Sequence, residues 1–202
     1  MALAGCGGEG EPNDAPYHSS LVPVSSEGFR EVVPSQNPGD GQGWSFALDD
    51  FILDEDATVT SVAWQGAWCL QQPGSSAPEP NATHFSVRFY PDDEGGPNDL
   101  APIQSATYPV AATNQTFEKS VPSLVCGTTL DTEFAYYRYQ VDLASPVTLS
   151  AGTTYWIGIQ AESPSAVINF GWRDGTTGNG LSLQVADGIT THHRDRAFSL
   201  ER

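Results

Sequence analysis

Aromatic side chains at outward positions of predicted strands are the residues in this chain best suited to ligand chemistry. A flat apolar ring on a polar surface can stack on the C–H face of a sugar, while neighbouring acids and amides bind its hydroxyl groups. The alternative is that these rings, like those of Trp44 and Trp64, belong to the core or lie beneath loops. Alternation places the rings of Trp156, Tyr90 and Tyr136 outward. Trp68 lies beside a long loop, and Trp172 lies beside an Arg-Asp pair.

An acidic turn around Gly95-Gly96 concentrates side chains that bear oxygen. Calcium takes six to eight oxygen ligands, and glycine allows a loop to wrap around the ion. The spacing is not that of an EF-hand, and the same residue types are expected in a solvated hairpin turn. The turn is therefore a candidate Ca²⁺ site, with a plain hairpin as the alternative; its ligands would be Asp92, Asp93, Glu94, Asn98 and Asp99.

The chain has three cysteines. Residues 3–6, Leu-Ala-Gly-Cys, resemble a bacterial lipobox, in which Cys6 would become lipid-modified, although only five residues precede it. We then expect Cys69 and Cys126 to form a disulfide in an oxidising compartment. Closing that loop would stabilise the fold by roughly 4 kcal/mol; the alternative is two unrelated buried thiols.

The other chemistry-bearing residues do not form a recognisable catalytic motif. There is no P-loop, G-x-G-x-x-G, G-x-S-x-G or H-E-x-x-H pattern. His192 and His193 are adjacent and would point apart, which favours a polar loop over a metal site. A carboxylate pair such as Asp50 and Asp174 leaves a glycoside hydrolase open without indicating one. The net charge of −17 argues against nucleic-acid binding. We expect a non-enzymatic protein.

Strands with period-two alternation must position these residues. The strongest signal is residues 147–160, two alternating runs around Ala151-Gly152, which predict a hairpin. No helical period is present, so the sequence predicts an all-β fold: a single jelly-roll-type antiparallel β-sandwich of about 9–11 strands over residues 36–202. Residues 1–35 are predicted to be a lipobox remnant and a flexible tether. The other predicted strands are 44–48, 58–68, 83–90, 103–110, 116–121, 134–143, 167–172, 181–185 and 197–200.

Several short motifs occur in a characteristic order. They include D-D-F-I-L (49–53), T-V-T-S-V-A-W-Q-G (58–66), F-S-V-R-F-Y-P-D-D-E-G-G-P (85–97), P-V-T-L-S-A-G-T-T-Y-W-I-G-I (146–159) and F-G-W-R-D-G (170–175). Together they resemble a β-sandwich domain of bacterial secreted and surface proteins that occurs beside PEP-CTERM or choice-of-anchor sorting tags. The resemblance implies an extracellular jelly-roll module similar in shape to carbohydrate-binding modules, and it brings no catalytic residues.

This chain departs from that pattern by its cysteine pair, by long loops at 71–82 and 122–133, and by ending without a sorting tag. A lipidated Cys6 would replace the tag, and Gly7 after it favours the outer membrane. We therefore expect an exported surface lipoprotein that acts as a non-catalytic binding or adhesion module for a glycan. The alternative is a structural or assembly subunit that binds another surface protein; a hydrolase is less favoured.

Overall fold

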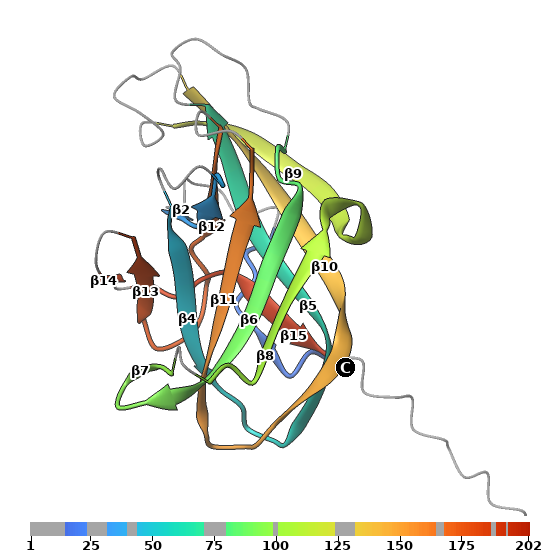
Figure 1. The fold of residues 1–202 in the computed structure, drawn as a ribbon, viewed down its shortest axis with the longest axis vertical. Helices are drawn as coiled ribbons and strands as arrows, with labels where there is room; N and C mark the ends of the chain where they lie inside the picture. The colour runs from blue at the N-terminus through green and yellow to red at the C-terminus, as the bar shows by residue number, and fades with distance from the viewer. Residues whose placement is uncertain are drawn as a thin grey trace, which may run out of the picture.

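Two curled antiparallel sheets pack face to face in the computed structural model of the chain (Figure 1). The structure describes residues 15–23, 32–39, 44–70, 80–98, 101–123, 132–164, 168–186, 189–192 and 194–202. Within these ranges it has fifteen strands and one 3₁₀ turn, η1 (Val110–Ala112). Four of the strands have only two or three residues. The predicted all-β, jelly-roll-type sandwich is confirmed.

The first sheet, here called the β5 sheet, is built on two long antiparallel strands that pair along most of their length. A register shift between Asp142 and Val147 bends the longer of the two strands, as a β-bulge does. This sheet consists of β1 (His18–Ser19), β2 (Val32–Pro34), β5 (Ala57–Leu70), β9 (Asn114–Ser123), β10 (Thr132–Leu149), β12 (Ile168–Arg173) and β15 (Phe198–Glu201).

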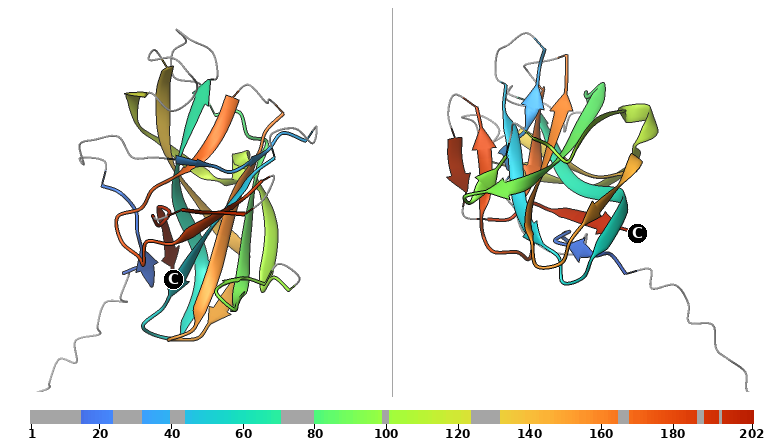
Figure 2. Two further views of the ribbon diagram at one scale, coloured as in Figure 1. Left: turned by 90° about the vertical axis from the view of Figure 1, so that its left-hand side faces the viewer. Right: turned by 60° about the horizontal axis from the view of Figure 1, so that its bottom comes forward.

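The second sheet, here called the β11 sheet, has β11 at its centre, antiparallel to β4 and β6. Its one parallel pairing among the described strands joins β11 to β3. Figure 2 shows the two layers from the side and from below. This sheet consists of β3 (Gln36–Asn37), β4 (Phe46–Ile52), β6 (His84–Asp93), β7 (Gly96–Pro97), β8 (Gln104–Pro109), β11 (Thr154–Glu162), β13 (Ser182–Val185) and β14 (Ile189–His192).

The predicted hairpin at Ala151-Gly152 is wrong, because the two runs belong to different sheets. β10 pairs with β5 up to Leu149, whereas β11 pairs with β4 and β6. Gly152 has a φ of 68° and donates its N–H to the Leu53 carbonyl, so it forms a corner between the layers. Both runs still face one core, which is why alternation alone does not distinguish a hairpin from a corner.

The core between the sheets is rich in aromatic side chains. Trp64 stacks on Tyr139 with ring centroids 5.4 Å apart, and Phe85 lies 4.7 Å from the same tyrosine ring. The hydroxyl of Tyr139 accepts a 2.7 Å hydrogen bond from Trp68 Nε1, so its polar atom is satisfied inside the core. Phe170 completes this cluster from β12. These contacts make the sandwich a single packed unit.

Part of the segment that composition assigns to the tether runs along the β5 sheet. β1 pairs with β15, and β2 pairs with β12. The Gln65 side chain makes two hydrogen bonds to the backbone of Val22: its Oε1 accepts the Val22 N–H, and its Nε2 donates to the Val22 carbonyl. In the described residues, no helix is long and apolar enough to cross a membrane.

Candidate binding groove

A second, smaller apolar cluster lies on the outer face of the β11 sheet, away from the core. The pleat of β4 turns Ala47 and Phe51 toward the core, so Phe46 and Leu48 point outward. Tyr90 and Trp156 are direct cross-strand neighbours on the same outer face. The partly buried side chains that cover this cluster come from β13 and the residue before it: Leu181, Leu183 and Val185.

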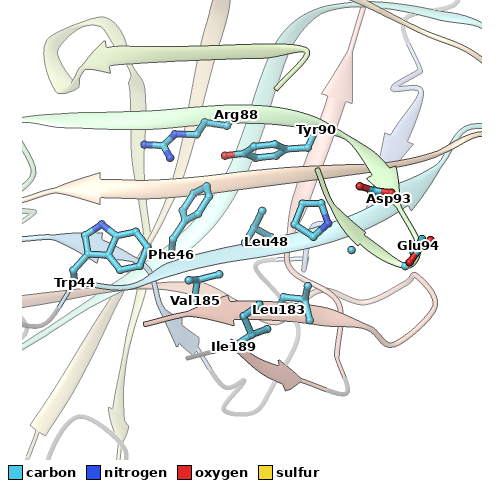
Figure 3. Close-up of a pocket in the computed structure, with 13 residues that line it drawn as sticks. Trp44, Phe46, Leu48, Arg88, Tyr90, Asp93, Glu94, Leu183, Val185 and Ile189 are labelled. Carbon is cyan, nitrogen blue, oxygen red and sulfur yellow. The ribbon is translucent and has the colours of Figure 1, made fainter. Parts of the chain in front are cut away.

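The cluster is open at one side and forms a groove of about 790 Å³ (Figure 3). Its walls come from the β6–β7 hairpin and from the β13–β14 pair. Two of the five exposed large apolar side chains among the described residues line it: Trp44 is 37% exposed and Ile189 is 72% exposed. The lining residues are Trp44, Phe46, Leu48, Arg88, Tyr90, Asp93, Glu94, Gly95, Gly96, Pro97, Leu183, Val185 and Ile189.

The groove floor depends on a close contact between β4 and β11. The ring of Phe46 lies directly against Gly158, where any side chain would overlap it. The Arg88 guanidinium lies over that ring, with its Cζ 4.9 Å from the ring centroid. Arg88 Nε also donates a 3.1 Å hydrogen bond to Ser86 Oγ. Gly158, Phe46 and Arg88 therefore form a stack in which each member positions the next.

The acidic turn forms one end of the groove, and its first aspartate is engaged within the protein. Asp92 Oδ1 accepts a 2.8 Å hydrogen bond from Trp156 Nε1, and Asp92 Oδ2 accepts the N–H of Gly95. Asp93 and Glu94 lie at the far end of the groove from the Arg88 guanidinium (Figure 3). Among the described residues, no three His, Cys, Asp or Glu side chains are grouped to hold a metal. Since Asp99 lies outside these residues, the calcium site stays a prediction.

A buried charge network supports the wall formed by β13 and β14. Arg196 Nη1 lies 2.6 Å from Asp174 Oδ1, and Arg196 Nε donates to Ser182 Oγ at the start of β13. Ser182 Oγ in turn donates to the carbonyl of Arg194, whose guanidinium also pairs with Asp174. The network links β13 to the segment, including Arg194 and Arg196, that leads into β15.

Two carboxylates of β4 lie on opposite faces of the strand, and Asp49 joins this network. Asp49 Oδ2 accepts the Arg196 N–H, and burial raises the pKa of Asp49 well above its ordinary value. Asp50 accepts a 2.6 Å hydrogen bond from Asn179, and burial also raises the pKa of Asp50. Asp174 is ion-paired and buried, and neither Asp50 nor Asp174 lines the groove. This placement does not support Asp50 and Asp174 as the catalytic pair of a glycoside hydrolase, which was considered from the sequence.

All five aromatics suggested as ligand-binding are buried, so the alternative that such rings lie in the core or beneath other residues holds for their exposure. Tyr90 and Trp156 point outward as expected, but they are 4% and 1% exposed because the residues beside and within β13 cover them. Tyr136 is on the outer face of the β5 sheet, beneath the Arg173 guanidinium. Trp68 and Trp172 are in the core. Of the five, only Tyr90 lines the groove.

The groove residues that sequence reasoning missed include Trp44, Phe46 and Arg88. Alternation correctly places Trp44, Phe46 and Leu48 on one face, but that face carries the outer cluster rather than the core. Both faces of this run carry apolar residues, so the alternation holds no signal of which face is the surface. Cys6 and Cys126 lie outside the described residues, and Cys69 is in β5, so the lipid anchor and the disulfide stay predictions.

A domain family described as "Domain of unknown function (DUF7901)" matches residues 32–195. The matched range contains both sheets' long strands and every residue that lines the groove. No curated protein and no solved structure matches the chain.

Proposed function

We propose that this chain, which belongs to the DUF7901 family, is a non-catalytic binding module that holds a glycan in the groove on the outer face of the β11 sheet. The observation that carries the proposal is the lining of the groove. An indole ring, an arginine and two carboxylates surround an apolar floor, which is the mixture that sugar recognition needs.

The size and shape of the groove fit this role. Its volume of about 790 Å³ lies within the range of sites that bind small ligands. The Trp44 side chain lines the groove and is partly exposed to solvent, so a pyranose could stack on its ring. The charged groups at the two ends of the groove would then bind hydroxyl groups or charged substituents of the same ligand.

The position of the acids favours binding over hydrolysis. Asp93 and Glu94 are consecutive residues at one end of the groove (Figure 3). Glycosidases place two carboxyl groups on either side of the scissile bond, at a separation that admits water or a covalent intermediate. Two neighbours in one hairpin turn do not give that arrangement, so we propose a module that retains its ligand unchanged.

A protein partner is the second candidate, and Ile189 favours it. This side chain is 72% exposed at the edge of the groove, beside the apolar wall formed by Leu183 and Val185. A partner segment could cover these three residues, as apolar residues at the centre of an interface are covered. That partner would make the chain the assembly subunit considered from the sequence.

We further propose that the protein is exported, attached to the outer membrane through a lipid on Cys6, and closed by a Cys69–Cys126 disulfide. Labelling with a palmitate analogue should mark the native protein, and Cys6→Ala should abolish the label. Mass spectrometry of the oxidised protein should yield a peptide that links Cys69 to Cys126, and free thiols at both positions would remove the disulfide.

Glycan binding is tested with the purified chain on a panel of soluble and insoluble polysaccharides, followed by calorimetry. Trp44→Ala should weaken binding at least about tenfold, because the stacking surface is lost. Phe117→Ala is the matched control: its ring is 55% exposed but lies on β9 of the other sheet. Absence of binding to every glycan, or equal losses in both variants, would refute the proposal.

A further inference from the structure

We propose that the groove selects a glycan that bears a carboxylate, a uronic acid, and that Arg88 pairs with this carboxylate. This inference rests on the proposed function and specifies the class of ligand. The chain is strongly acidic, with 25 acidic residues and 8 basic ones, so carboxylate partners for its arginines are abundant.

Arg88 differs from the other arginines that the structure describes. Each of the other five has a carboxylate within 3.6 Å, and these pairs are Arg138–Glu201, Arg173–Glu118, Arg194–Asp174, Arg196–Asp174 and Arg202–Glu55. Within the described residues, Arg88 has no such partner; its contacts are the Ser86 hydroxyl and the Phe46 ring. A guanidinium keeps its charge at every physiological pH. The Arg88 guanidinium is therefore a permanent cation in the groove, and no carboxylate of the described residues forms an ion pair with it.

The Arg88 side chain is held so that it can bind a planar anion. Its Nε donates to Ser86 Oγ at 3.1 Å, and its Cζ lies 4.9 Å from the centroid of the Phe46 ring. These two contacts fix the plane of the guanidinium and leave both terminal nitrogens for a ligand. A carboxylate accepts two parallel hydrogen bonds from such a fork, and an arginine that is already fixed loses little entropy on binding.

The remaining charges of the groove would orient this ligand. The Arg88 guanidinium lies at the end where Trp44 lies, whereas Asp93 and Glu94 lie at the opposite end (Figure 3). A uronate stacked on Trp44 would place its carboxylate near the arginine and away from the acids. The net charge of −17 opposes an anionic ligand at long range, but charges beyond about 8 Å are largely screened at physiological ionic strength.

The test compares acidic polysaccharides with their carboxyl-reduced forms, in which a neutral hydroxymethyl group replaces each carboxylate. Polygalacturonate, alginate and hyaluronan, each with its reduced form, are titrated into the purified chain. We expect at least one uronate polymer to bind roughly 10- to 100-fold more tightly than its reduced form, the range for hydrogen bonds to a charged group. The preference should fall as salt is added.

Variants then assign the preference to Arg88. Arg88→Gln should reduce the ratio of acidic to reduced glycan affinity to about one, and Arg88→Lys should restore part of it. Arg138→Gln, an exposed arginine on the other sheet, should leave the ratio unchanged. Equal binding of acidic and reduced forms by the wild-type protein would overturn this inference while leaving the proposed function standing. A failure to bind any glycan would overturn both.

Discussion

Replacing Gly158 with alanine is expected to disturb the groove more than the core. A Cβ at Gly158 would overlap Cζ of Phe46 and lie 2.8 and 3.0 Å from Cε2 and Cε1 of that ring. Carbon atoms pack at about 3.5–4.0 Å, so the ring must move outward. Because Arg88 lies over this ring, the displacement passes to the residue that we propose to bind the ligand.

The cost to stability follows from the overlap. Overpacking at one site typically costs about 1–3 kcal/mol. In a domain of this length, such a loss lowers the melting temperature by roughly 3–10 °C. We expect Gly158→Ala to fold, to melt in that range below the wild type, and to bind glycan at least about tenfold more weakly. Calorimetry of unfolding and of binding measures the two effects on the same protein.

Gly66→Ala provides a control with the same chemical change. A Cβ at Gly66 would overlap Cε2 and Cζ of Phe170, a core ring on the neighbouring strand β12 of the same β5 sheet. This variant should lose a similar amount of stability while keeping its affinity for the glycan. If both variants weaken binding equally, or if Gly158→Ala binds normally, the stack of Gly158, Phe46 and Arg88 does not shape the site.

Two further predictions concern the charge network behind the groove. Arg196→Met leaves the buried Asp174 carboxylate without its 2.6 Å partner. This should lower the free energy of unfolding by about 3–5 kcal/mol and the melting temperature by roughly 10 °C. The control Arg202→Gln, at an exposed ion pair, should lower the free energy of unfolding by less than about 1 kcal/mol. Burial raises the pKa of Asp49 above its unfolded value, so the protein loses stability as pH rises from about 4 through the folded-state pKa. Asp49→Asn should therefore melt above the wild type at neutral pH and close to it at about pH 4, whereas the exposed change Asp54→Asn should not show this trend in thermal melts.

The architecture was predictable because most strands obey a simple alternation. Val62 and Trp64 lie at alternate positions of the predicted strand 58–68, and both face the core on β5; a two-layer fold follows from one apolar face per strand. The corner at Gly152 was not predictable in the same way. A turn between two alternating runs looks alike in a hairpin and in a crossing between sheets, and only the pairing partners distinguish them.

The groove was not predictable because its strand has two apolar faces. On β4, Ala47 and Phe51 face the core while Phe46 and Leu48 face outward, and alternation does not indicate which set is inside. The cover over Trp156 depends on β13, a strand distant in sequence that pairs with β4. Arg88 is identified only when the partners of all the described arginines are compared, and these pairs span up to 147 residues of sequence.

Quenching of tryptophan fluorescence by acrylamide tests the central claim most directly. Of the five tryptophans, Trp44 is 37% exposed, and Trp64, Trp68, Trp156 and Trp172 are at most 1% exposed. Quenching of the folded protein therefore reports on Trp44, and Trp44→Phe should remove most of it. A uronate polymer that occupies the groove should reduce quenching in proportion to the bound fraction. A glycan that binds while Trp44 stays fully accessible, or no change with any polymer, would contradict the assignment of this groove as the ligand site.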